Sequence, residues 1–293
     1  MKHPLVSIIV PTYNRENLVI ETLESIRDQS YTYLELLILD DGSSDNTVAV
    51  ISNWIEKYRS RFSNVQLFPF PQNSGKSNVV NRGFDLFTGD YVMVFDSDDL
   101  MIQNTVAIEV AHLQSHPTIN CLCAGAYLMS GSQKTTVQFH SMRECPNSDN
   151  IAQSYGDIFL KGNPIISSTV MMKRSVVKET GYFNPTLRVT HDWDYWIRIS
   201  QRFTIGFLNV PVINYRVNSN GSISQNKFRL FKEVMVVTSM YGSHYDRITI
   251  LATIGQQIKK HLWMAKNDRS IKQGMGIFLY GIISLIRYLL TGK

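Results

Sequence analysis

The sequence has little of what marks secreted, membrane-spanning or disulfide-rich proteins. Its three cysteines, Cys121, Cys123 and Cys145, are too few for a disulfide framework, and a single Cys-x-Cys pair lacks the partner ligands of a structural zinc site. The apolar run at residues 6–10 is too short for a signal sequence, and the run at residues 276–286 falls short of the roughly 20 residues that span a bilayer. We therefore expect reduced, buried thiols and a cytoplasmic protein.

Charged residues are also few, at 18% of 293, while 44% of the residues are hydrophobic, which suits a globular protein with a sizeable core. The net charge of +5 is unevenly distributed. Residues 1–223 contain 18 Lys and Arg against 21 Asp and Glu, whereas residues 224–293 contain 11 against 3. A basic tail contacts anionic lipid or nucleic acid, or forms a solvated helical face. Because no basic stripe with interleaved aromatics occurs elsewhere, we expect no nucleic-acid binding.

Short apolar, β-rich runs alternate with segments of helical period through the first half of the chain. This alternation is typical of βαβ units, so we predict an α/β fold with a mainly parallel central sheet flanked by helices. The predicted strands cover residues 6–10, 34–40, 65–68, 91–95 and 120–124. Right-handed crossovers place the carboxyl ends of parallel strands at one edge of the sheet, where ligands bind in such folds.

Polar clusters follow three of the predicted strands at the point where each strand ends. They are Pro11-Thr12-Tyr13-Asn14, Asp40-Asp41-Gly42-Ser43 and Asp96-Ser97-Asp98-Asp99. Each cluster taken alone is also common turn chemistry. Because all three are expected at the same edge of the sheet, together they predict a ligand-binding site.

Three carboxylates within residues 96–99 form the densest of these clusters. Like charges packed so closely repel one another unless a cation or protons compensate them, which favours a divalent metal with oxygen ligands, Mg²⁺ or Mn²⁺. Mg²⁺ is typically held by one or two carboxylates plus substrate phosphates, so an open Asp-x-Asp pair suits a nucleotide diphosphate. The alternative is that Asp98 or Asp99 only caps a helix.

Four ordered motifs resemble those of family 2 of the inverting glycosyltransferases. They are VSIIVPTYN at residues 6–14, LDDGSSD at residues 39–45, Asn73-x-Gly75 followed by Asn81-x-Gly83, and GDYVMVFDSDD at residues 89–99. The match covers residues 5–100 in order and spacing and extends more loosely to about residue 220. The resemblance implies the Rossmann-like GT-A fold of nucleotide-sugar enzymes over residues 1–223, with nucleotide-sugar binding in 1–125 and an acceptor part in 126–223.

The same resemblance implies roles for individual residues. Those that would contact the nucleotide are Pro11, Thr12, Tyr13, Asp40, Asp41, Lys76, Asn81 and Asp96. Asp98 would coordinate the metal that bridges the diphosphate, with Asp96 facing the ribose or the metal. The sequence departs from the family pattern at one position in this region: many members have Arg just before the residue that corresponds to Asn81, whereas this chain has Val80.

Two later segments complete the implied site. THDWDYW at residues 190–196 is similar to the family's late acidic motif, which makes Asp192 the candidate catalytic base, although His191 replaces the usual acid. Two residues on, Asp194 would point away on a helix, so we expect a cap or a salt bridge there. Residues 215–218 are similar to a Tyr-Arg-x-His motif with Asn218 in place of the histidine, so Arg216 either contacts the diphosphate or lies on the surface.

The resemblance therefore implies inverting, metal-dependent transfer of a sugar from a nucleotide-diphosphate sugar to a hydroxyl of a saccharide or lipid-linked acceptor, in bacterial polysaccharide biosynthesis. Without the Gln-x-x-Arg-Trp signature of processive synthases, we expect one sugar per event. One alternative function is that of a sugar-nucleotide pyrophosphorylase, but such an enzyme needs a Gly-rich loop with Arg after the first strand, and residues 10–14 do not supply one. A second alternative is a non-catalytic nucleotide-sugar-binding protein. A nicotinamide-dependent oxidoreductase is disfavoured, because no G-x-G-x-x-G motif follows the first predicted strand.

The second half of the chain is predicted to be less regular and then helical. The pattern predicts a loop over residues 143–157, a candidate lid or acceptor loop, running into a helix at 151–160. Further elements are expected as a strand at 165–172, a helix at 191–202, strands at 205–209 and 212–217, and helices over 224–293.

The last of these helices is expected to be amphipathic. Eight apolar residues of the segment share one broad face: Phe278, Leu279, Ile282, Ile283, Leu285, Ile286, Leu289 and Leu290. With the lysines before it, this helix either lies in a membrane interface or packs on the catalytic domain or a second subunit.

Overall fold

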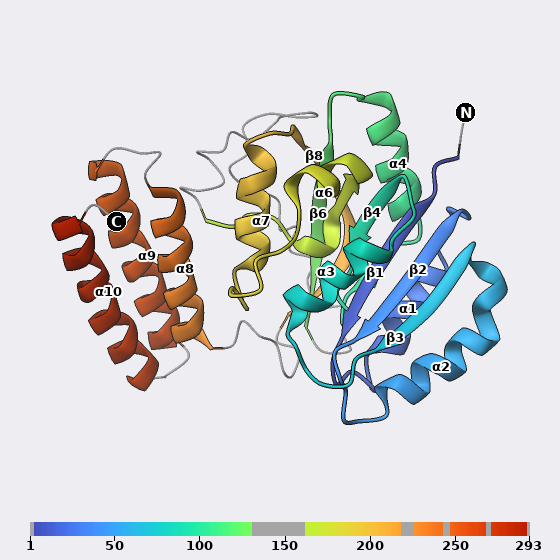
Figure 1. Cartoon of the computed structure of the whole chain (residues 1–293), viewed down its shortest axis with the longest axis horizontal. Helices are drawn as coiled ribbons and strands as arrows, with labels where there is room; N and C mark the ends of the chain where they lie inside the picture. The colour runs from blue at the N-terminus through green and yellow to red at the C-terminus, as the bar shows by residue number, and fades with distance from the viewer. Residues whose placement is uncertain (1–2, 131–161, 218–225, 243–246, 268–270, 292–293) are drawn as a thin grey trace.

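The computed structural model describes residues 3–130, 162–217, 226–242, 247–267 and 271–291. Within them the strands form one eight-stranded sheet in the order β3-β2-β1-β4-β7-β6-β8-β5 (Figure 1). The strand bounds are β1 Val6–Thr12, β2 Leu34–Asp40, β3 Asn64–Pro69, β4 Tyr91–Val94, β5 Leu100–Met101, β6 Cys121–Ser130, β7 Val170–Lys173 and β8 Ile205–Val217. The predicted loop at 143–157, the helix at 151–160 and Cys145 lie outside the described residues.

Helices cover both faces of the sheet. Their bounds are α1 Val19–Arg27, α2 Thr47–Tyr58, α3 Lys76–Leu86, α4 Thr105–Ser115, α6 Arg174–Thr180 and α7 His191–Ser200, with short 3₁₀ turns at η1 Arg59–Arg61 and η2 Ser167–Thr169. On one face, α1, α2 and α4 pack against Ile8 and Val10 of β1. On the other, α3, α6 and α7 pack against Ile9. Since neighbouring side chains of a strand point to opposite faces, burial on both sides accounts for the largely apolar sequences of β1 and β2, in which the polar residues Ser7 and Glu35 are hydrogen-bonded to each other.

The strand directions confirm the predicted mainly parallel sheet. β1 pairs in parallel with β2 and β4, and β2 pairs in parallel with β3. β7 runs antiparallel to both β4 and β6, and β6 is parallel to β8, so β6 and β8 share the direction of β1. Only β7 and β5 run the other way among the described strands. The carboxyl ends of β1, β2 and β4 therefore meet at one edge, as expected.

Three elements differ from the sequence prediction. The predicted strand at 165–172 begins with the η2 turn, in which Thr169 Oγ1 donates to the Ile166 carbonyl, so regular pairing starts only at Val170. The two strands predicted at 205–209 and 212–217 are one strand, β8, whose pairing with β6 shifts register on both sides of Pro211. Proline has no N–H to donate to the sheet, and the irregular pairing around it accommodates this loss. The two-residue β5 on the edge was not predicted.

The helical C-terminal region is confirmed; its described residues form a bundle of three helices, α8 Lys227–Tyr241, α9 Arg247–Asn267 and α10 Ile271–Thr291. Figure 1 shows α8 nearest the catalytic part and α10 farthest from it. One continuous apolar cluster joins Trp196 of α7 to Phe231, Ile254 and Ile277 of the bundle. The boundary at residue 223 stays a prediction. None of the described helices combines the length and the hydropathy that crossing a bilayer requires.

α10 packs through the narrower of its two sides. Ile277, Gly281 and Tyr288 are buried against the other two helices, whereas Phe278 and Leu279 of the broad apolar side are 55% and 63% exposed. Glycine permits this approach, because a Cβ on Gly281 would lie 2.8 Å from Ile258. Four residues of the expected apolar face, Phe278, Leu279, Ile282 and Ile283, are thus turned outward, whereas Leu285 packs against the apolar cluster.

Candidate active site

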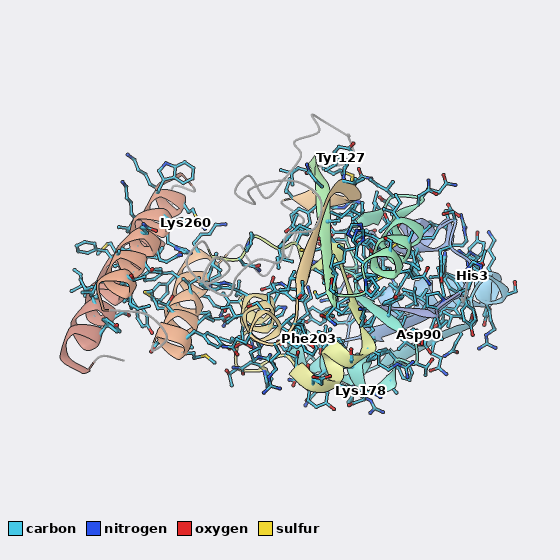
Figure 2. All side chains as sticks on the ribbon, turned by 90° about the horizontal axis from the view of Figure 1, so that it is seen from above. His3, Asp90, Tyr127, Lys178, Phe203 and Lys260 are labelled. Atoms are coloured by element: carbon cyan, nitrogen blue, oxygen red, sulfur yellow. The ribbon has the colours of Figure 1, made fainter. Side chains whose placement is uncertain are left out.

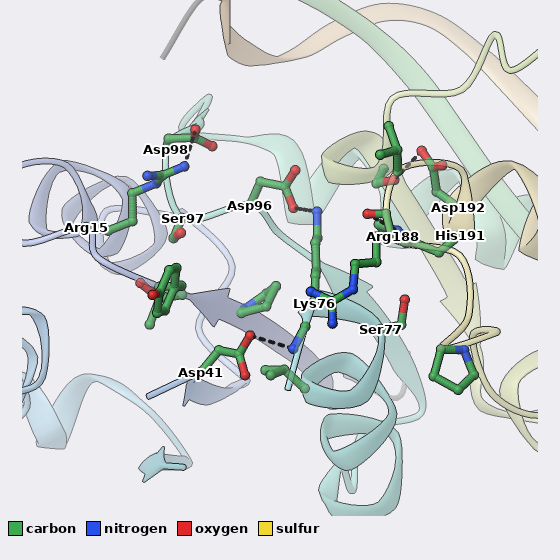
Figure 3. Close-up of a pocket in the computed structure, with 18 of the residues that line it drawn as sticks. Arg15, Asp41, Lys76, Ser77, Asp96, Ser97, Asp98, Arg188, His191 and Asp192 are labelled. Carbon is green, nitrogen blue, oxygen red and sulfur yellow. Dashed lines mark hydrogen bonds and ion pairs between the residues drawn. The ribbon is translucent and has the colours of Figure 1, made fainter. Parts of the chain in front are cut away.

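A cavity of about 860 Å³ opens at the carboxyl edge of β1, β2 and β4, within the usual size range of small-ligand sites. The amino ends of α3 and α7 border it. Figure 3 shows Asp96 and Asp98 on one side and Asp192 on the other, with Lys76 and Arg188 between them in this view. Eight of the eleven residues to which the resemblance gives a role in the site line the cavity: Pro11, Thr12, Tyr13, Asp41, Lys76, Asp96, Asp98 and Asp192.

The turn after β2 is tied to the start of α3 by one carboxylate. Asp41 accepts hydrogen bonds from the backbone N–H groups of Ser74 and Gly75, at 2.7 and 2.9 Å, and from the Ser74 hydroxyl at 3.0 Å. Gly42 takes a left-handed φ of 72°, and a Cβ there would lie 2.6 Å from the backbone of Gln72. Only glycine fits at that position, which keeps Asp41 at the cavity wall.

Two cations pair with the carboxylates that follow β4. The Lys76 ammonium lies 2.5 Å from Asp96, and an Arg15 guanidinium nitrogen lies 3.5 Å from Asp98. Burial lowers the pKa of Lys76, but the attraction of Asp96 outweighs it and raises this pKa above its usual value. Lys76 therefore remains charged, and two opposing charges partly neutralise the acidic cluster.

Asp99 anchors this acidic cluster to η2 and β8. Its carboxylate accepts from the Ser168 hydroxyl at 2.6 Å and from the Arg216 backbone N–H at 2.9 Å. The same Ser168 oxygen accepts from the Asp96 N–H, so a single hydroxyl joins both carboxylate residues to η2. Burial, with Asp96 and Asp98 nearby, raises the pKa of Asp99 well above its usual value. Carboxylate oxygens of Asp96, Asp98 and Asp99 lie within 4.8 Å of one another, a set that suits a divalent cation.

The opposite wall carries Asp192 in the first turn of α7. Its Oδ2 accepts from Asn163 Nδ2 at 2.8 Å and from the Ser167 hydroxyl at 3.3 Å, and its Oδ1 accepts from the Trp193 N–H at 2.7 Å. The carboxylate is thereby oriented from two separate segments. Asp194 behaves as expected: it is buried, forms an ion pair with Arg198 and accepts from the Tyr241 hydroxyl.

His191 and Tyr215 also line the cavity, and both are neutral. Burial lowers the pKa of His191 and raises the pKa of Tyr215. The His191 Nδ1 lies 3.2 Å from the Arg188 carbonyl. Because a carbonyl can only accept, Nδ1 carries the proton.

Three residues implied by the resemblance, Asp40, Asn81 and Arg216, do not line the cavity, and their expected roles stay predictions. Asp40 accepts from the Ser43 N–H and hydroxyl and so shapes the turn. The Asn81 amide donates to the Phe183 carbonyl and accepts from its N–H. The Arg216 guanidinium donates to the Asp98 carbonyl and pairs with Glu21, so it holds the acidic turn instead of facing a diphosphate.

Sequence reasoning missed several residues of the cavity wall: Arg15, Asn163, Ser167, Arg188 and Arg229. Arg15 directly follows the first polar cluster, and that position was the only signal for it. The other four come from loops or from the start of α8, where no period or motif marks them. They are found only once the chain is folded.

Comparison with known proteins identifies the family. Residues 7–181 match the model of glycosyl transferase family 2. The chain belongs to this family. An uncharacterized glycosyltransferase of Haemophilus influenzae is 28% identical over 75% of this chain and 68% of its own length. A putative teichuronic acid biosynthesis glycosyltransferase of Bacillus subtilis, TuaG, is 29% identical over 80% and 87%. Family membership confirms the predicted enzyme class, a glycosyltransferase.

Solved structures share the fold. Residues 1–349 of S. aureus TarS, in complex with UDP-GlcNAc, superpose with a TM-score of 0.68 at 19% identity, over 96% of this chain and 81% of that one. The mannosyltransferase PcManGT of Pyrobaculum calidifontis, with GDP-Man and Mn²⁺, gives 0.65 at 18% identity, over 100% and 77%. These likenesses confirm the predicted GT-A architecture. The chain spans only 32% of the length of a related Rickettsia bellii glycosyltransferase.

Proposed function

We propose that this glycosyltransferase moves a sugar from a nucleotide-diphosphate sugar to an acceptor hydroxyl with inversion, using Asp192 as the base and a divalent metal at Asp96 and Asp98. The observation that supports this most is the layout of one cavity. The acidic cluster lies on one wall and an oriented carboxylate, Asp192, lies on the other. A donor held between them would present its anomeric carbon to an acceptor beside Asp192.

The residues present fit a divalent cation. Carboxylate oxygens within 4.8 Å of one another are the hard ligands that Mn²⁺ and Mg²⁺ prefer, and Asp96 and Asp98 both face the cavity. When bound, the cation would neutralise charge on the diphosphate as it departs. The solved structure of PcManGT, which shares the fold, is a complex with GDP-Man and Mn²⁺.

The wall formed by β1, β2 and α3 is the proposed nucleotide side. Thr12 Oγ1 is buried in this wall and has no hydrogen-bond partner among the described residues. An unpaired buried hydroxyl at a cavity supports a ligand contact there. Asp41 holds the 74–75 turn in place, and Lys76 offers a charged ammonium to the phosphates.

At the other wall, Asp192 is proposed to take the proton of the acceptor hydroxyl. The acceptor oxygen then forms a bond to the anomeric carbon from the face opposite the diphosphate. The old bond from that carbon to the phosphate oxygen breaks, and its electron pair leaves with the nucleoside diphosphate. Asn163 and Ser167 donate to Oδ2 of Asp192, so they fix the carboxylate while Oδ1 or Oδ2 receives the proton.

The names of the relatives and the ligands of the solved structures support a class of substrate. TarS was solved with UDP-GlcNAc, PcManGT with GDP-Man, and TuaG is named for teichuronic acid biosynthesis. We propose a nucleoside-diphosphate sugar as the donor and a saccharide or lipid-linked saccharide as the acceptor, with one sugar added per event.

A thermal-shift screen of nucleoside diphosphates and their sugars, with Mn²⁺ and with a chelator, tests the donor side. Nucleotides with one particular nucleobase are expected to raise the Tm of the protein by several degrees with Mn²⁺, and the chelator is expected to reduce that increase. In the Asp98→Asn variant, the part of the Tm increase that depends on Mn²⁺ should be lost. The matched control is Asp90→Asn, an exposed carboxylate at the opposite end of β4, which should behave as wild type.

If no nucleotide stabilises the protein, the proposed function is wrong. If sugar 1-phosphates and nucleoside triphosphates stabilise it instead, a pyrophosphorylase is favoured. If donors bind but no nucleoside diphosphate is ever released, a non-catalytic binding protein is favoured.

A further inference from the structure

The outer side of α10 carries an apolar surface that no described residue covers. We call it the α10 apolar face; its members are Met275, Phe278, Leu279, Ile282 and Ile283, between 38% and 70% exposed. They repeat at intervals of three and four residues and so form one stripe about 12 Å long. A stripe of large exposed side chains on one helix marks an interaction site.

The packing of the bundle keeps this face outward. Gly276 and Gly281 lie on the inner side of α10, where a Cβ would approach Phe228 to 3.1 Å and Ile258 to 2.8 Å. Ile277 and Tyr288 are buried on the same inner side. Turning α10 about its axis would press larger side chains into these close contacts, so the apolar face is a fixed feature of the folded chain.

Exposed lysines and a tryptophan lie beside this face on α9. Lys259, Trp263 and Lys266 are all exposed and, at spacings of four and three, share one side of that helix, whereas the Lys260 ammonium lies close to Gly162 of the catalytic part. α9 packs against α10 and ends only a few residues before α10 begins, so the two helices run antiparallel. Trp263, four residues before the end of α9, therefore lies level with Met275, four residues after the start of α10.

The outer surface of the bundle lacks negative charge among its described residues. Their one carboxylate, Glu233, is turned toward the catalytic part, where it accepts from the N–H groups of Val189 and Thr190. Asp246 and Asp268 lie outside the described residues. Residues 224–293 hold 11 Lys and Arg against 3 Asp and Glu. The surface thus combines an apolar stripe, an exposed indole and uncompensated lysines.

We propose that the α10 apolar face, with the α9 lysines, docks on the surface of an anionic phospholipid bilayer. The apolar side chains would enter the headgroup region while Lys259 and Lys266 meet lipid phosphates, and Trp263 suits the boundary between the two. Pairing of this face with a second copy would bring two basic surfaces together, which like-charge repulsion opposes. The proposal is independent of the proposed reaction.

Sedimentation of the full chain with lipid vesicles tests it. We expect binding to vesicles of phosphatidylcholine mixed with phosphatidylglycerol, much weaker binding to phosphatidylcholine alone, and release by added salt. Lys259→Gln should weaken binding about fivefold, the amount typical of one lysine near an anionic surface. Its control is Lys178→Gln, an exposed lysine on the catalytic part that is labelled in Figure 2.

The apolar contribution is tested with Leu279→Glu combined with Ile283→Glu. Both side chains are exposed, so the variant should fold, which circular dichroism checks, and its vesicle binding should fall at least tenfold. Ile108→Glu on α4, also an exposed apolar side chain, is the matched control and should bind as wild type. The proposal is overturned if the double variant binds normally, if anionic vesicles do not bind the protein, or if light scattering shows a dimer that the double variant dissociates.

Discussion

Two buried carboxyl groups, Asp99 and Glu109, both have raised pKa values but differ in their contacts. Asp99 accepts from Ser168 and from the Arg216 backbone and so serves the acidic turn. Glu109 lies on α4 with neither carboxylate oxygen hydrogen-bonded to a described residue, and burial alone raises its pKa well above the usual value. A buried polar group without a partner lowers the stability of the fold.

Glu109→Gln is predicted to stabilise the protein at neutral pH. The folded state keeps Glu109 protonated where the unfolded chain, with an ordinary pKa of about 4.3, has already released the proton. The free energy of unfolding of the wild type therefore falls as pH rises above that value, by up to about 1.4 kcal/mol per unit from this group. Urea unfolding between about pH 5 and pH 8 should show a shallower decline in the variant. Equal slopes would contradict this account; the exposed Glu56→Gln is the control.

At the scale of single elements, the turn from β2 to α3 joins stability to binding. Asp41 is the acceptor for the two N–H groups that precede α3, whose first residue is Lys76. Loss of this carboxylate leaves both donors unpaired and frees the segment that carries Lys76.

Asp41→Ala is therefore predicted to lower the free energy of unfolding by about 1–3 kcal/mol and to weaken nucleotide affinity as well. Asp45→Ala is the matched control, because Asp45 accepts from the Thr47 N–H at the start of α2 but does not line the cavity. It should lose stability while keeping the dissociation constant for the nucleotide, measured by calorimetric titration. An unchanged affinity in Asp41→Ala would remove Asp41 from the nucleotide site.

The regular first half could be predicted because each strand is buried on both faces and each connection is short. The positions of Asn81 and Arg216 away from the cavity follow from geometry that a motif does not contain. Asn81 lies five residues after Lys76 on α3, which rotates it about 140° around the helix and away from the cavity. Arg216 follows Tyr215 on β8, and consecutive strand residues point to opposite faces, so only Tyr215 reaches the cavity.

The residues that orient Asp192 had no sequence signal. Asn163 and Ser167 belong to an irregular segment before β7, and only the folded chain brings them to α7. Hydropathy alone left open whether the broad apolar side of α10 packs on protein or faces outward. Two glycines allow close approach on the other side of the helix, and that packing leaves most of the described broad side exposed.

For the whole molecule, the bundle and the catalytic part share one apolar cluster, in which Phe231 and Val237 of α8 are fully buried. The Tyr241 hydroxyl also donates to Asp194 of α7 at 2.6 Å. We predict a single cooperative transition in scanning calorimetry of the full chain, and aggregation of a chain truncated after residue 223, because α7 would lose its cover. Two separate transitions, or a stable truncated chain, would show that residues 224–293 form an independent domain.

The central claim is that Asp192 acts in the chemistry while its neighbour Asp194 acts in the fold. The most direct test compares Asp192→Asn with Asp194→Asn, by measuring the rate of nucleoside diphosphate release with the donor found by the thermal screen. Asp192→Asn is predicted to lower that rate by about 10²–10⁴-fold with unchanged nucleotide affinity and Tm. Asp194→Asn is predicted to lower the Tm. A wild-type rate in Asp192→Asn, or an equal loss of nucleotide binding, would contradict the account.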